Sequence, residues 1–133
     1  MDSLFELDEK LYRAVYPDAI FWKDNGNVSS AAFLSKRGGC SVDRGNFRND
    51  LDVVLDMRNR GFKGSIITVT VQDCRNIDAE VIYSPSRNNI YHSEILKDKE
   101  HEKLTAGQRK FLAKHAVIVS NDEVDDDERS SHS

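Results

Sequence analysis

The stretch Ser65-Ile66-Ile67-Thr68-Val69-Thr70-Val71 is the clearest strand in the chain, and it decides the fold. Nearly all of its residues are β-branched, and branched side chains favour the pleated backbone of a strand. Such dense branching indicates burial on both faces. We therefore expect this strand to lie inside a sheet.

The segment just before it, Phe47–Arg60, predicts a helix. Asn46 can cap its first turn, and Gly61 can close its last. Its apolar side chains recur at helical spacing on one side, which is the pattern of a helix that packs against a core. These side chains are Phe47, Leu51, Val54 and Leu55.

Working outward, the remaining pattern alternates between short strands and helices. Strands are expected at 28–34, 40–43, 81–83 and 90–96, and a first helix at 3–16, ended by Pro17. A last helix should begin at Thr105, which forms a capping box with Gln108. Together these elements predict an α+β domain with a mixed or antiparallel sheet of about five strands and helices packed on one face.

Charge divides the chain into a body and a tail. Of the 23 acidic residues, six lie after Ser120, and the formal net charge of −4 comes from this end. The rest of the chain has 18 basic and 17 acidic residues. We expect one globular domain over residues 1–119 and a disordered acidic tail over 120–133, which could stay solvated, dock on a basic partner or shield a basic patch of the same chain.

Composition excludes several classes of protein. Cys40 and Cys74 are too few for a disulfide framework and match no zinc spacing, so a reducing cytoplasm fits best. The acidic start lacks the basic region of a signal peptide, and no apolar run is long enough for a bilayer. A near-neutral body makes extended nucleic acid an unlikely partner. No metal or other cofactor is implied.

The common catalytic motifs are absent, so candidate sites rest on smaller clusters. Ser29 and Ser30 precede a run of small residues, and their hydroxyls could donate to an anion, although tight packing against a helix is the commoner role. Arg13, Ser41 and Arg44 would complete an anion-binding pocket if the fold brings them together.

A second cluster lies on the strand expected at 90–96. His92 and Glu94 are two residues apart and share one face of that strand. The histidine could therefore act as a base oriented by the carboxylate. A histidine bonded to a neighbouring carbonyl is the commoner structural alternative.

The order of motifs resembles a family of small bacterial proteins. The family carries a Leu-Tyr-Arg segment, a Ser-x-Ala-Phe segment, a Leu-Ser-Val segment and a Pro…His segment in that order. The matching positions here are Leu11-Tyr12-Arg13, Ser30–Phe33, Ser41-Val42 and Pro85 with His92; Cys40 stands where the family usually has leucine. The resemblance covers about residues 11–119. It implies a compact domain of bacterial or phage origin, and because the family is uncharacterised it implies no activity.

The layout is also similar, more distantly, to the split-sheet toxins that transfer ADP-ribose. That resemblance implies that Arg13, Ser30 and Glu94 would bind a dinucleotide and act on it. The likeness concerns the fold only, and function must be argued from a site.

Two functions follow as hypotheses. The first is a non-catalytic binding module that recognises a protein partner or a small anionic ligand. The alternative is a small enzyme that processes nucleotides or nucleic acid, either like an ADP-ribosyltransferase or as a hydrolase. Arg13 and Arg44 would bind phosphate, Ser30 and Ser41 would orient it, and His92 with Glu94 would do the acid–base chemistry.

Overall fold

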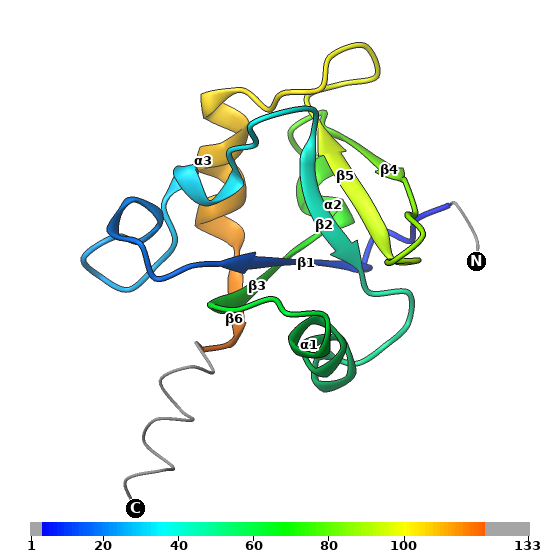
Figure 1. The fold of residues 1–133 in the computed structure, drawn as a ribbon. Helices are drawn as coiled ribbons and strands as arrows, with labels where there is room; N and C mark the ends of the chain where they lie inside the picture. Colours follow the sequence, from blue (N-terminus) through cyan, green and yellow to red (C-terminus); the bar gives the residue numbers. More distant parts are fainter. Residues whose placement is uncertain (1–3, 122–133) are drawn as a thin grey trace, which may run out of the picture.

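A six-stranded antiparallel sheet organises the chain (Figure 1). The computed structural model describes residues 4–121 of the 133. The strands are β1 (Lys10–Val15), β2 (Cys40–Arg44), β3 (Ser65–Thr70), β4 (Glu80–Tyr83), β5 (His92–Leu96) and β6 (Val117–Ser120). Their order across the sheet is β4-β5-β2-β1-β3-β6, and every neighbouring pair is antiparallel. The predicted α+β class is confirmed, with six strands for the expected five or so.

The strand β3 lies inside the sheet and is buried on both faces, as its sequence predicted. It pairs with β1 along its whole length and with β6 on its other side. Ile66 and Ile67 are adjacent and so point to opposite faces, and their exposed fractions are 0% and 1%.

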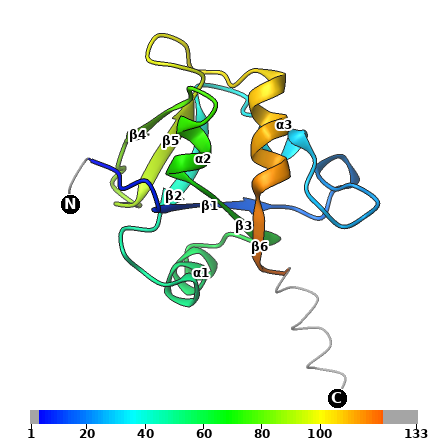
Figure 2. The same ribbon diagram turned by 180° about the vertical axis from the view of Figure 1, so that it is seen from behind.

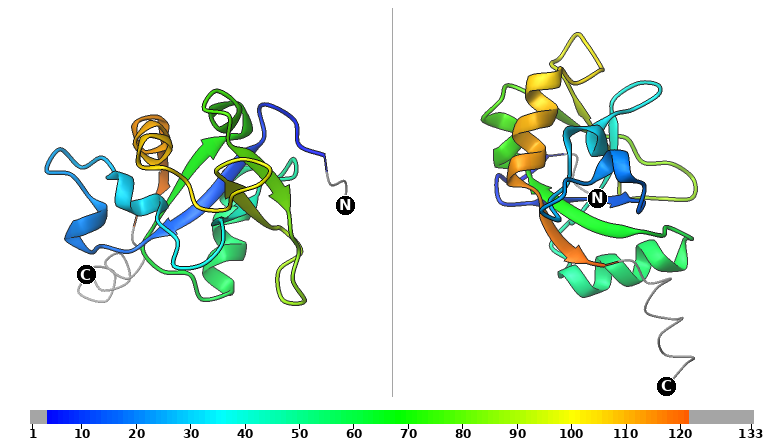
Figure 3. Two further views of the ribbon diagram at one scale, coloured as in Figure 1. Left: turned by 90° about the horizontal axis from the view of Figure 1, so that it is seen from above. Right: turned by 90° about the vertical axis from the view of Figure 1, so that its left-hand side faces the viewer.

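The helices cover both faces of the sheet. On one face α1 (Asp50–Asn59) packs Val53 and Met57 against Tyr12 and Ile66. On the other lie α2 (Val71–Arg75) and α3 (Ala106–His115), together with the 3-10 turns η1 (Ala19–Phe21) and η2 (Ser30–Phe33) (Figures 2 and 3). The expectation of helices on one face is corrected, because β1 and β3 carry apolar side chains on both faces and both faces need cover.

The predicted helix over residues 3–16 is wrong, because most of its second half is β1. Leu11 and Val15 belong to the core on the α3 side, whereas Tyr12 belongs to the core under α1. A strand buried on both faces shows no polar alternation, so its apolar residues also fit a helical period. In a helix over 3–16, Leu4, Leu7, Leu11 and Val15 would share one face, but Leu4 and Leu7 are exposed.

Residues 28–34, predicted as a strand, instead contain the 3-10 turn η2 at Ser30–Phe33, and only Val28 makes a β-bridge, to Trp22. Ala32 and Phe33 of this turn are buried and belong to the core on the α3 side. The small residues of this segment allow it to lie closely against α3, which is the packing role that competed with ligand binding for Ser29 and Ser30.

The helix α1 starts three residues later than predicted and faces the sheet with a different side. Asn49 caps it, its side chain accepting the amide of Asp52 at 2.8 Å. Val53, Val54 and Met57 point inward. Gly61 follows the helix with φ = 96°, in the left-handed region that favours glycine, as predicted.

At the carboxyl end, the capping box of Thr105 and Gln108 begins α3 as predicted. Ser120 belongs to β6, so the sheet extends one residue past the predicted domain boundary. The rest of the predicted tail, residues 122–133, lies outside the described residues. Within residues 4–121, no helix has the length and apolar character needed to span a bilayer.

Candidate functional site

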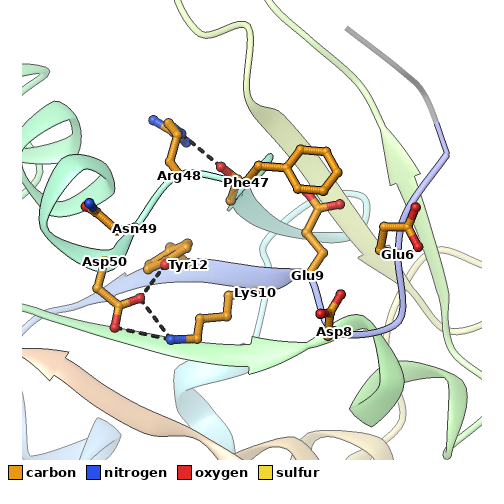
Figure 4. A pocket seen from close by; sticks show the side chains of 10 residues that line it. Glu6, Asp8, Glu9, Lys10, Tyr12, Phe47, Arg48, Asn49 and Asp50 are labelled. Atoms are coloured by element: carbon orange, nitrogen blue, oxygen red, sulfur yellow. Dashed lines mark hydrogen bonds and ion pairs between the residues drawn. The ribbon is translucent and has the colours of Figure 1, made fainter.

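A cavity of about 360 Å³ opens where β1, the loop after β2 and the first turn of α1 meet; we call it the α1 cavity (Figure 4). Figure 4 shows the ring of Phe47 on the side of Glu9, with Tyr12, Lys10 and Asp50 on the other side. The lining residues are Glu6, Asp8, Glu9, Lys10, Tyr12, Gly45, Phe47, Arg48, Asn49 and Asp50.

The loop into α1 holds Phe47 out of the core. Asn46 and Phe47 both have positive φ, 50° and 66°, which residues other than glycine seldom adopt. The amide of Asn46 donates to Glu9 Oε2 at 3.0 Å, and this bond secures the loop. As a result the Phe47 side chain is 88% exposed. Backbone strain that keeps a large apolar side chain in water points to a functional role for it.

One wall of the cavity is a network around Asp50. The hydroxyl of Tyr12 donates to Asp50 Oδ1 at 2.5 Å, and Lys10 Nζ lies 3.0 Å from the same oxygen. The bond from Tyr12 holds the pKa of Asp50 below its usual range, with Lys10 acting in the same direction. Burial, and then the same bond, raise the pKa of Tyr12, so its phenol stays protonated.

The opposite wall includes a buried ion pair. Arg44 Nε and Nη2 bond both oxygens of Glu9, at 2.8 and 2.9 Å, and Nη2 also donates to the carbonyl of Leu4 at 2.9 Å. The guanidinium lies 4.1 Å from the ring centre of Phe5 and 5.2 Å from that of Tyr83. Both charged side chains are almost fully buried, so the negative charge of Glu9 is balanced by Arg44 inside the protein.

The remaining cation of the cavity, Arg48, is also engaged by the protein. Its guanidinium donates to the carbonyls of Gly45 and Arg44 at 3.0 and 2.8 Å. It lies 3.4 Å from Asp56 and stacks 3.4 Å above the centre of the Tyr91 ring. These contacts make Arg48 part of the support of the loop.

Glu6 and Asp8 give the α1 cavity negative charge that is available to a ligand. Within residues 4–121, neither carboxylate takes part in an ion pair. Two carboxylates near the exposed ring of Phe47 suit an ammonium or guanidinium group, because carboxylates attract it and the face of an aromatic ring accepts it. Among the same residues, no three His, Cys, Asp or Glu side chains are placed to hold a metal ion.

A second hollow, of about 540 Å³, lies between α1 and β6; we call it the α1–β6 groove. It shares Asp50 with the α1 cavity, so the two hollows adjoin. Its apolar lining comes from the helix and from the last strand. The lining residues are Asp50, Leu51, Val54, Leu55, Arg58, Val119 and Ser120.

The predicted anion-binding residues are mostly used within the fold. Arg13 donates to three backbone carbonyls, those of Ala32, Ser41 and Leu34, at 2.7, 2.7 and 2.9 Å. It thereby ties the segment around η2 to β2. Arg44 is held by Glu9, as described above.

The predicted serines are separated. Ser29 Oγ donates to the carbonyl of Ile20 at 2.6 Å, and Ser30 begins η2. Ser41 lies on β2, opposite Glu94 of β5. Of the predicted set, Arg13, Ser41 and His92 border one small hollow of about 110 Å³. Ser29, Ser30, Arg44 and Glu94 do not line it.

His92 and Glu94 share a face of β5 but bond to Ser84 separately. The Nδ1 atom of His92 lies 2.9 Å from the carbonyl and 3.0 Å from the hydroxyl of Ser84. Ser84 Oγ donates to Glu94 Oε2 at 3.2 Å, and Glu94 Oε1 accepts the amide of Gly39 at 3.1 Å. The carboxylate therefore fixes the serine and the glycine loop.

The residues that define the α1 cavity were missed by sequence reasoning. Glu6 and Asp8 fall in the helix predicted at 3–16, and Phe47 falls on the buried side of the separate helix predicted at 47–60. One signal was present: Gly45-Asn46 precedes Phe47, and both residue types tolerate positive φ.

Comparison with known proteins adds no relative. No protein-family model matches the chain, and no curated protein or solved structure is significantly similar to it. The resemblance to the bacterial family therefore stays a prediction.

Proposed function

We propose that the chain is a binding module that recognises a protein partner through the outer side of α1. The observation that carries the proposal is the exposure of Phe47, Leu51 and Leu55, at 88%, 65% and 52%. Leu51 and Leu55 are one helical turn apart on the same side of α1, and Phe47 lies in the loop before the helix. Large apolar side chains exposed on one helix and on the loop before it mark a surface that binds another protein.

The partner segment is basic as well as apolar. The α1 cavity offers Glu6 and Asp8 to a lysine or arginine side chain, next to the ring of Phe47. The formal net charge of −4 also favours the approach of a basic partner. An anionic ligand is less well supported, because Arg13 and Arg44 already bond to carbonyls and to Glu9.

The catalytic alternative has weaker support. Three of the five N–H donors of the Arg13 guanidinium already bond to backbone carbonyls, which leaves two for a phosphate. Glu94 bonds Ser84 and Gly39 and makes no bond to His92 among the described residues. We further propose a reducing cytoplasm as the site of action, since Cys40 and Cys74 are buried free thiols.

The test compares full-length proteins purified gently from the cells that naturally make the chain. A doubly charged variant, Leu51→Asp with Leu55→Asp, is set against the matched control Leu34→Asp, whose side chain is 50% exposed on an unrelated loop. Quantitative mass spectrometry should find a specific protein with wild type and Leu34→Asp, depleted at least tenfold with the double variant. Equal recovery with all three proteins, or no specific protein with any, would contradict the proposal.

A further inference from the structure

The α1–β6 groove follows α1 along its length. Asp50, the first residue of the helix, lines one end of the groove, and Arg58, in the last turn, lines the other. At the rise of an α-helix, these two residues lie about 12 Å apart along the helix axis, which is about two turns. Between them Leu51 and Leu55 are exposed, and Val54 is buried. The middle of the groove is therefore apolar.

The two ends of the groove differ in charge. At the Asp50 end the groove adjoins the α1 cavity, where Glu6 and Asp8 make no ion pair within residues 4–121. Asp50 itself is balanced by Lys10. At the other end, Arg58 makes no ion pair within the same part of the chain. The surface is thus acidic beside the start of α1 and basic beside its end.

Neutral groups of the protein fix Arg58 in this position. Its Nη2 donates to the carbonyl of Asn121 at 2.9 Å and to Ser120 Oγ at 3.3 Å. Its Nη1 donates to the carbonyl of Phe62 at 3.2 Å. Because the oxygens that accept these bonds carry no formal charge, they orient the guanidinium without balancing its positive charge.

The shape of the groove favours a helix over an extended chain as its occupant. On one side, β6 is an edge of only four residues, and Val119 forms a bulge between the partners of Ile66 and Ile67. Short and bulged edges discourage pairing with a further strand. On the other side, Leu51 and Leu55 lie one turn apart, a spacing that suits the four-residue ridges of another helix.

Charge then sets the direction of such a helix. The helix dipole favours acidic side chains in a first turn and basic ones in a last turn. A helix antiparallel to α1 places its last turn beside Glu6 and Asp8 and its first turn beside Arg58, so both preferences are met. In the opposite direction, the same contacts would require basic side chains in the first turn, against the dipole of the partner helix.

We propose that the partner contributes an amphipathic helix that lies antiparallel to α1 in the α1–β6 groove. Apolar side chains on one stripe of this helix contact Leu51 and Leu55. A lysine or arginine of its last turn enters the α1 cavity beside Glu6, Asp8 and Phe47, and an acidic residue of its first turn faces the basic end of the groove. This inference rests on the proposed function and specifies the kind of segment that binds.

The experiment titrates isotopically labelled full-length protein with a capped peptide, Glu-Ala-Gln-Leu-Ala-Gln-Ala-Leu-Ala-Gln-Leu-Ala-Gln-Lys-Arg, kept helical by a hydrocarbon staple opposite its leucines. Amide signals of 50–58 and 117–120 should shift on binding. Leu55→Glu should weaken binding at least tenfold, and the matched control Leu34→Glu should not. A nitroxide label on the carboxyl end of the peptide should broaden the signals of 6–10, and one on its amino end those of 58–62.

A double-mutant cycle tests the basic contact. Replacing Lys-Arg of the peptide with Gln-Gln should weaken binding to the wild-type protein severalfold. The same replacement should have little effect on binding to a Glu6→Gln, Asp8→Asn protein, because the two changes remove the same interaction. An equal loss with both proteins would show that the basic side chains do not enter the α1 cavity, and would overturn the proposed direction.

Two further results would overturn the inference. One is a bound peptide whose two labels broaden the opposite sets of signals, since that helix would be parallel to α1. The other is no binding of the stapled peptide at millimolar concentration, while the natural partner is still recovered in a Leu51- and Leu55-dependent way; the proposed function would then stand. Loss of that recovery as well would refute the proposed function itself.

Discussion

At the scale of single residues, Phe47 combines a strained backbone conformation with an exposed side chain. A phenylalanine with φ = 66° lies in a region that costs about 1 kcal/mol or more for a residue with a side chain. The ring is 88% exposed, so burial of the ring offsets little of that strain energy. Selection for stability alone would favour glycine here.

Replacing Phe47 with glycine should therefore stabilise the protein. We expect Phe47→Gly to raise the free energy of unfolding by about 1 kcal/mol, because glycine adopts positive φ without a clash. Phe47→Ala keeps the strain and should give no gain. Urea unfolding followed by circular dichroism measures both variants. A Phe47→Gly protein less stable than Phe47→Ala would mean that the strain at this position costs less than the added freedom of glycine in the unfolded chain.

At the scale of elements, α3 is fixed at its start by one side chain with two roles. Gln108 Oε1 accepts the amide of Thr105 at 2.9 Å and closes the capping box. Its Nε2 donates to the carbonyls of Ile77 and Lys97, at 3.1 and 2.9 Å. The second role ties α3 to the segments that follow α2 and β5.

Gln108→Glu separates these two roles. Glutamate can still close a capping box, but it cannot donate to the two carbonyls and places negative charge beside them. We expect a loss of about 1–3 kcal/mol in the free energy of unfolding. Thr105→Ala, which removes only the cap, should cost about 1 kcal/mol. Chemical denaturation decides, and wild-type stability in Gln108→Glu would show that the bonds to Ile77 and Lys97 contribute nothing.

The helices α3 and α1 show what the sequence could and could not predict. The capping box of α3 depends only on nearby residues, because the spacing of Thr105 and Gln108 is enough to predict it. The buried side of α1 is not local. Its residues offer two apolar sides, Val53 with Met57 and Leu51 with Leu55, and only the position of the sheet decides which one is covered.

β1 and the candidate site depend on partners far away in the chain. Leu11 pairs with Arg44 and with Val69, and no pattern within residues 3–16 contains that information. The α1 cavity could not be predicted for the same reason, because it forms only where β1 meets the loop after β2. The strand β3 was predictable because its dense branching is a property of its own residues.

At the scale of the whole molecule, the larger core is one continuous cluster. Cys40 of β2 and Cys74 of α2 both belong to it, at 1% and 0% exposure. Burial raises the pKa of the Cys40 thiol, and burial with the nearby Asp73 raises that of Cys74 to about 12. Neither thiol is reactive while this core is closed.

Both thiols should therefore become reactive together, through global unfolding. In an excess of an aromatic disulfide reagent at pH 8, we expect Cys40→Ala and Cys74→Ala proteins to react slowly. After correction for their stabilities, the two should share one rate that rises with urea as the unfolding equilibrium does. Fast reaction of one thiol in the absence of urea would show that β2 or α2 opens by itself.

The strand order has a consequence for the time in which the chain folds. Of the five pairings in the sheet, only β4 with β5 joins strands linked by a short loop. The others must close long stretches of chain before any pairing compensates the lost entropy, so the search is governed by distant encounters. Folding should take milliseconds to seconds rather than microseconds. We expect the slow step to be the pairing of β1 with both β2 and β3, because β1 joins the two parts of the sheet.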